Sequence, residues 1–163
     1  MANAIKSSLL GAWLGAALFF SAVVAPSAFA VLRQFDLANA NEIAGAIVSR
    51  ALTVINVSGF VIGLVLLAAT LLWKRVGLSF GLVLQLFSLA VLTITTAVGH
   101  WVIAARMLTL RTALSLPIDR LALDDPRRLA FGDLHRYSVV LLSAAMIAAI
   151  VALVLLGARR QAV

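Results

Sequence analysis

The chain has 163 residues, 64% of them hydrophobic, and a mean hydropathy of +1.13. One water-soluble core of this size could not bury so much apolar surface, so a soluble globular protein is excluded and lipid must cover the remainder. The net charge is +7, but every charged residue lies outside four long uncharged runs. The basic residues are therefore expected to flank a membrane, and a nucleic-acid groove is not predicted. The absence of cysteine excludes disulfides, thiolate catalysis and cysteine-ligated metals.

The uncharged runs cover residues 7–32, 51–73, 76–105 and 137–158. About 20 apolar residues, rising about 1.5 Å each, cross the roughly 30 Å hydrocarbon core as a helix, so each run is long enough. The predicted fold class is an all-α membrane protein with four transmembrane helices in an up-down bundle. We expect one domain over residues 1–163, with spans at about 9–32, 51–73, 76–105 and 137–158.

The first run resembles a secretory signal, because Lys6 precedes an apolar stretch that ends in the A-x-A pattern of residues 28–30. The apolar run continues past that pattern through Val31 and Leu32. We therefore expect the segment to be kept as the first span. Pro26 removes a backbone donor inside it and predicts a kink.

Capping residues predict that the later helices extend beyond the bilayer on the side opposite the termini. Asn39 and Asn41 would start the second helix about ten residues before its span. The third helix is expected to continue past Arg106 until Pro117 stops it. Asp125 and Pro126 form an N-cap and N1 pair that predicts the start of the fourth helix.

Four crossings place both termini on one side, and the charges then sort by side. The terminal side has five basic residues and no acid, and the opposite side has eight basic residues and all six acids. These numbers alone do not fix the orientation, but the acid-free tails and the short turn at 73–76 favour cytoplasmic termini. The expected location is a bacterial inner membrane.

Three G-x-x-x-G patterns predict close helix packing, since four-residue spacing places both glycines on one helix face. Two interpretations stay open, namely packing within the bundle and docking onto another membrane subunit. The pairs are Gly11 and Gly15, Gly59 and Gly63, and Gly77 and Gly81, and the fourth run has the equivalent Ala144, Ala148 and Ala152.

Polar residues at membrane depth need a partner or a cavity, so they mark candidate sites. Ser88 and three others on the third helix follow one 3.6-period stripe, which should face the interior. Two interpretations stay open: these groups satisfy one another and hold the bundle in register, or they form a polar pocket that opens away from the termini and is bordered by Arg50, Arg106 and Asp133. The candidate pocket residues are Asn56, Gln85, Thr96, His100, Arg106, Asp133, His135 and Arg136.

No cofactor or catalytic role is predicted. His100 and His135 could supply axial imidazoles to a heme, but their expected depths differ by about two helical turns. Met107, seven residues after His100, would suit copper(I), although one methionine and two histidines form no repeated metal motif. Recognised catalytic motifs and paired intramembrane carboxylates are missing from the sequence.

Two segments resemble a known family. The stretch from Gly11 through Phe19, Phe20 and Pro26 to Phe29, with Ala44 and Gly45, is similar to the family of transmembrane protein 205 and its bacterial relatives. The segment from Phe131 to Ser138 looks like that family's signature at the start of the last span. The resemblance implies a four-helix membrane domain of largely unknown function whose first span is retained.

That family looks distantly similar to four-helix proteins of the copper-resistance D and protoporphyrinogen-oxidase J types. The heme-bearing type would place a histidine in its first span, and residues 7–32 contain none. Two functions are therefore compared. The first is a non-enzymatic scaffold or accessory subunit in contact with lipid and other membrane subunits, and the second is a protein that binds or transports a small molecule, metal or heme around His100 and His135.

Overall fold

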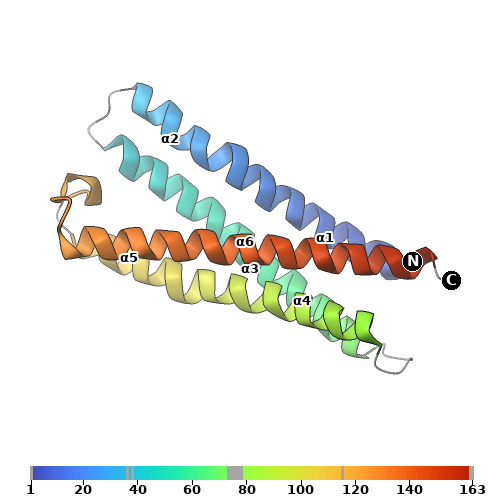
Figure 1. The fold of residues 1–163 in the computed structure, drawn as a ribbon. Coiled ribbons are helices and arrows are strands. Elements are labelled where there is room, and N and C mark those ends of the chain that lie inside the picture. The colour runs from blue at the N-terminus through green and yellow to red at the C-terminus, as the bar shows by residue number, and fades with distance from the viewer. Residues whose placement is uncertain (1, 36, 38, 73–78, 115, 162–163) are drawn as a thin grey trace.

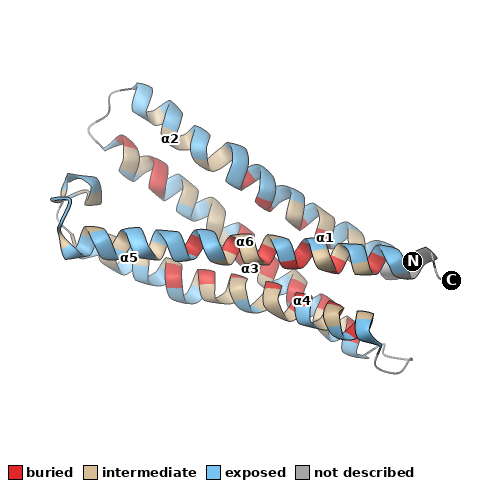
Figure 2. Cartoon of the chain, in the orientation of Figure 1, coloured by how far each residue is buried: buried red, intermediate tan, exposed pale blue. Residues whose placement is uncertain are grey.

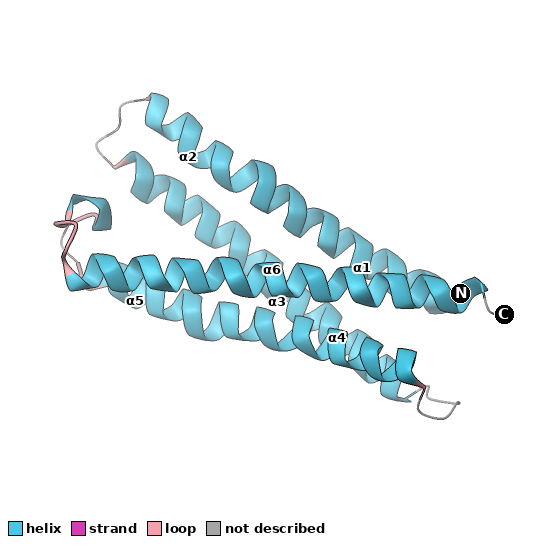
Figure 3. Cartoon of the chain, viewed as in Figure 1, coloured by secondary structure: helices cyan, strands magenta, loops and turns pink. Residues whose placement is uncertain are grey.

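The computed structural model describes the chain outside residues 1, 36, 38, 73–78, 115 and 162–163 (Figure 1). All regular structure in the described part is helical (Figure 3). Besides six α-helices there are two π-helical segments, η1 and η2, and one 3-10 turn, η3. The elements are α1 (Ala2–Phe19), η1 (Phe20–Val24), α2 (Ala25–Gln34), α3 (Ala40–Leu72), α4 (Phe80–Ala97), η2 (Val98–Ala104), α5 (Ala105–Thr112), η3 (Ile118–Arg120) and α6 (Pro126–Gln161).

These elements form four long helices, because α1, η1 and α2 are continuous, as are α4, η2 and α5. All four are long and apolar enough to cross a membrane. They run up and down, with both chain ends at one end of the bundle and the connections around η3 at the other (Figure 1). The predicted all-α four-helix membrane bundle is confirmed, and the chain is an integral membrane protein.

Side-chain hydrogen bonds cap the starts of α4 and α6. α3 begins at Ala40 and α6 at Pro126. Ser79 caps α4, since its hydroxyl accepts the backbone N–H of Leu82 at 3.3 Å. The turn at 73–76 predicted from sequence lies outside the described residues.

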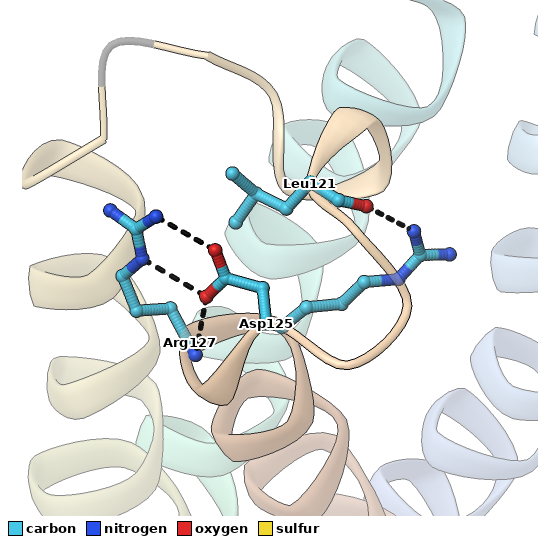
Figure 4. A network of polar contacts seen from close by, with 4 residues as sticks. Leu121, Asp125 and Arg127 are labelled. Atoms are coloured by element: carbon cyan, nitrogen blue, oxygen red, sulfur yellow. Dashed lines mark hydrogen bonds and ion pairs between the residues drawn. The ribbon is translucent and has the colours of Figure 1, made fainter.

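Asp125 is the side-chain cap of α6, and its Oδ1 accepts the backbone N–H of Arg127 at 2.8 Å (Figure 4). The Arg127 guanidinium also donates to this carboxylate, through Nη2 to Oδ2 at 2.7 Å. These hydrogen bonds favour the ionised carboxylate and lower the pKa of Asp125 to about 2. The start of α6 is therefore fixed by an ionised cap at neutral pH.

The third long helix ends earlier than expected. α5 stops at Thr112, five residues before Pro117. The chain leaves the helix through a turn in which the Leu114 N–H bonds the Arg111 carbonyl at 3.4 Å. The expectation that Pro117 itself ends the helix is therefore wrong, because the tighter turn has already replaced the helical bonding; Pro117 instead precedes η3.

The core lies toward the end of the bundle that holds the termini, where all four long helices meet. α4 packs between α3 and α6, and α1 packs against both α6 and α3. Leu10, Leu89 and Leu92 are fully buried at these contacts. Trp13 is also buried, and its indole N–H donates to the Ile55 carbonyl across the α1 and α3 interface at 2.9 Å.

The packing glycines divide into two groups. Gly59 lies against the Trp13 ring and Gly63 against Thr93. At both positions the missing side chain lets a neighbouring helix come close. A Cβ at Gly11, Gly15 or Gly81 would meet no atom within 4 Å, so a neighbouring helix does not approach closely at these three positions. Gly77 lies outside the described residues, while Ala148 and Ala152 are buried and Ala144 is half-buried.

The opposite end of the bundle is open. None of the residues of α2 or α5 is buried, and none from 126 to 137 in α6 is buried, whereas buried residues alternate along the rest of α6 (Figure 2). There α2 packs on α3 and α5 packs on α6. In Figure 1 the two pairs diverge toward the connections. The divergence leaves apolar and charged faces uncovered between the pairs.

Candidate functional site

A half-open cavity of about 1170 Å³ lies between the α2 and α3 pair and the α5 and α6 pair, and we call it the lateral cleft. Sites for small molecules commonly measure about 300–1,000 Å³, so its size fits an organic ligand. The α6 wall is one helix face, since its residues recur every three or four positions. They are Arg128, Phe131, Gly132, His135, Ser138, Val139, Leu142, Ser143 and Met146.

Both π-helical segments border the lateral cleft. Phe20 and Ser21 line it from η1, and His100, Trp101 and Ala104 line it from η2. π-helical turns inside long helices occur frequently at functional sites. Pro26 also lines the cleft; it lies in the first turn of α2, directly after η1, and the helix continues through it to Gln34. Pro26, where a kink is predicted, therefore lies directly after the π-helical segment η1, and the helix continues without a break.

His100 brings an unsatisfied polar atom to the cleft wall. Its ring packs edge-on against Trp101 with the centroids 4.9 Å apart, and Trp101 packs edge-on against Phe60 at 5.0 Å. The Nδ1 atom is buried and has no hydrogen-bond partner among the described residues. Such an atom is costly to bury, so His100 is a candidate for contact with a bound polar group.

Four arginines and two carboxylates line the end of the cleft nearest the connections. Arg111 reaches from α5 across to α3, where its guanidinium lies against Gly45, and it also stacks on the Phe131 ring at 5.2 Å. Gly45 is buried, and any side chain there would collide with Arg111. The arginines are Arg33, Arg50, Arg111 and Arg128, and the carboxylates are Glu42 and Asp119.

Polar contacts also tie the walls of the cleft together at this end. Arg33 donates to Asn41 at 3.1 Å, which joins α2 to α3. Asn41 in turn donates to Asp119 at 3.0 Å and joins α3 to η3. Arg128 of α6 donates to the backbone carbonyls of Leu121 at 2.6 Å and of Asp119 at 3.2 Å. The connections are therefore held over the cleft by hydrogen bonds.

The structure separates the predicted pocket residues into three groups. His100 and His135 line the lateral cleft together with Arg50. Asn56, Gln85 and Thr96 are buried in the bundle and do not line it. Arg106, Asp133 and Arg136 are exposed and do not line the cleft. Each of the three lies one or two positions along its helix from residues that line the cleft. Because each position turns the helix by about 100°, their side chains leave the helix in other directions.

The buried polar stripe does not cross-link the bundle as the alternative interpretation required. The hydroxyls of Ser88 and Thr96 donate to carbonyls of their own helix, at 2.9 Å to Leu84 and 2.7 Å to Leu92. Gln85 Oε1 is buried without a partner among the described residues. Asn56 packs instead against Gly99 of η2, where a Cβ would stand 3.2 Å from its Nδ2. A side chain at position 99 would require the Asn56 amide to move by a few tenths of an ångström.

The donors at the cleft do not make a recognisable metal site. Met107 lines the cleft with His100 and His135. Within the described ranges, however, three or more histidine or acidic side chains do not gather anywhere as a metal-binding group, and the chain has no cysteine. No metal or heme is therefore assigned to these residues.

Sequence reasoning missed Gly45 and the contributions of Arg33, Arg111 and Arg128. The spacing of Arg128, Phe131 and His135 was the available signal, because positions three and four apart share a helix face. Arg111 gave no such signal, since its partner Gly45 belongs to a different long helix.

Comparison with known proteins adds a family but no function. Neither the curated proteins nor the solved structures contain a match to the chain. The model of the family described as a domain of unknown function (DUF4149) matches residues 8–115, from α1 through α5, while α6 lies outside the match. This match covers more than half of the 163 residues, and the chain therefore belongs to the DUF4149 family.

Proposed function

We propose that this membrane protein binds an amphipathic small molecule in the lateral cleft. The observation that carries the proposal is a cavity of about 1170 Å³ whose lining changes from charged to apolar along its length. Arginines and carboxylates line the end near η3, whereas Phe20, Leu142 and Met146 line the part nearer the core. A molecule with a polar head and an apolar body matches that order.

The resemblance to the transmembrane protein 205 family is part of the proposal. The segments that carry it meet at the cleft, because Pro26, Phe29, Gly45, Phe131 and His135 all line it. We further propose that residues 1–163 form one unit in a bacterial inner membrane with cytoplasmic termini. The charged end of the cleft would then lie on the outer side of that membrane.

Filling the cleft should weaken binding of a fluorescent phospholipid with a pyrene-labelled acyl chain. Ala46 of α3 is exposed and lines the cleft, so Ala46→Phe is expected to raise the Kd for this probe about tenfold, since it occupies ligand space without crowding the core. Binding is measured by energy transfer from tryptophan to pyrene in a nonionic detergent.

The matched control is Ala68→Phe, on the same helix, exposed and outside the cleft. It should leave the Kd unchanged. If both variants bind the probe as the unmodified chain does, the lipid is not held in the cleft and the proposal is wrong.

A scaffold or accessory-subunit function is the second candidate, and one observation favours it. Gly11 and Gly15 lie one turn apart on α1 with no atom near enough to contact an added side chain, so another helix could approach there. Packing of this kind would join the chain to a larger membrane complex.

This second function predicts that Gly15→Leu abolishes a complex that the chain forms in native membranes, because the leucine would hold the partner helix away. The mass of the detergent-solubilised complex on a native gel measures the effect. Gly157→Leu is the control, since Gly157 is exposed and also without neighbours within 4 Å. A Gly15→Leu complex of unchanged mass would contradict this function.

A further inference from the structure

We infer that the amphipathic ligand is anionic, with a carboxylate or phosphate head bound by the arginines of the lateral cleft. The inference rests on the proposed function and adds the chemical class of the ligand. Two positive charges remain in excess, because four arginines share the cleft with Glu42 and Asp119. Arginine binds both oxyanions through paired N–H donors, so either head fits the same groups.

Among the described residues, the ion pairs at this end of the bundle do not involve the cleft arginines. Asp125 pairs with Arg127 at 2.7 Å and Asp133 with Arg136 at 3.6 Å, and these four residues all lie off the cleft lining. Asp125 and Asp133 are therefore engaged outside the cleft, whereas Glu42 remains in it and its charge acts on Arg111.

The contacts that position three cleft arginines are to neutral groups. Arg111 rests on Gly45 and on the Phe131 ring, and Arg128 is held by two backbone carbonyls. Arg33 donates to the side-chain amide of Asn41 and lies 5.9 Å from the Phe29 ring centroid. These contacts orient the guanidinium groups through neutral partners. Glu42 offsets part of the charge of Arg111, but the four arginines still outnumber the two carboxylates, and oriented donors with excess positive charge favour an anion.

Arg50 extends the basic region toward the apolar part of the cleft. It is exposed, it lines the cleft, and no hydrogen bond or ion pair joins it to another described residue. It follows Gly45 by five residues of α3, about 7.5 Å along the axis. A head group that passes Arg111 would therefore contact Arg50. Replacement of Arg50 should leave the fold intact, because its side chain makes no hydrogen bond or ion pair with the described residues.

The apolar part of the cleft has room for an acyl chain. Its α6 wall runs from Phe131 to Met146, fifteen residues or about 22 Å of helix. Leu142 lies near the inner end of this wall, and Phe20 faces the same space from η1. A head at the arginines would direct its chain along this wall toward the bundle core.

The test compares three pyrene-labelled probes that share one acyl chain: a phosphatidic acid, a free fatty acid and a zwitterionic phosphatidylcholine. The full-length chain in a nonionic detergent should bind at least one anionic probe tenfold or more tightly than phosphatidylcholine. Whether phosphatidic acid or the fatty acid binds better identifies phosphate or carboxylate as the preferred head.

Arg50→Gln and Arg111→Gln should each weaken binding of the preferred anionic probe at least fivefold and leave phosphatidylcholine binding unchanged. Arg106→Gln is the control, because Arg106 lies on α5 as Arg111 does and is exposed as Arg50 is, but does not line the cleft; it should bind as the unmodified chain does. Arg50→Gln keeps the test decisive if Arg111→Gln fails to fold.

Equal affinity for the three probes, or no loss in Arg50→Gln, would overturn the anionic assignment. If the probes bind equally and Ala46→Phe weakens all of them, the cleft still binds amphipathic molecules and only the charge selection is wrong. If none of the probes binds, the proposed function fails together with this inference.

Discussion

Gly59→Leu is expected to destabilise the folded chain by about 1–3 kcal/mol, the usual cost of overpacking a core. Gly59 is buried, and a Cβ there would stand 2.7 Å from Trp13 Nε1 and 2.8 Å from two ring carbons. The indole cannot withdraw freely, because its N–H is bonded to the Ile55 carbonyl and its ring lies in the core. Thermal unfolding of the purified protein in detergent measures the loss.

Gly81→Leu is the control for this prediction, since no atom lies within 4 Å of a side chain at that position. It should change the unfolding temperature far less than Gly59→Leu does. Equal unfolding temperatures for Gly59→Leu and the unmodified chain would mean that α1 and α3 do not approach as closely as described.

Trp13→Ala should have the largest effect of any single truncation, about 3–5 kcal/mol, because a large buried side chain is replaced by a cavity. The Trp13 side chain is only 4% exposed and belongs to the main core cluster. The variant also loses the 2.9 Å hydrogen bond to Ile55. Thermal unfolding and the loss of near-ultraviolet circular dichroism from a packed indole measure it.

Trp13→Phe separates the two contributions, since a buried ring remains and the net loss from the hydrogen bond is about 1 kcal/mol. The double variant Trp13→Ala with Gly59→Ala gives a further check. The three atoms nearest to a Cβ at position 59 all belong to the indole, so the alanine should cost much less once the indole is gone. Additive losses in the double variant would argue against the contact.

Length, hydropathy and capping chemistry were enough to predict the fold. Four uncharged runs determine four long helices, and Asp125 with Pro126 fixes the start of α6 by a local hydrogen bond. The π segments and the divergence of the helix pairs were not predicted, because both depend on packing between distant parts of the chain. Identical glycine patterns likewise have different environments: a Cβ at Gly59 would clash with Trp13, whereas a Cβ at Gly15 would meet no atom within 4 Å.

The candidate site was predicted only in part, for a related reason. Helical periodicity correctly indicates which residues share a face, so His100 falls on the inner side of its helix and lines the cleft. Periodicity does not show which face of a partner helix lies opposite. Arg106 and Asp133 were therefore assigned to the pocket, while Arg111, whose place depends on Gly45 of α3, was not.

Each π-helical segment changes which residues of its long helix face inward between one end of the bundle and the other. A π turn takes one more residue than an α turn, which shifts the register of the following residues by about 100°. η1 and η2 each lie between a helix with buried core residues and a shorter helix that has none. The residues before each shift can therefore face the bundle core, while those after it face the lateral cleft.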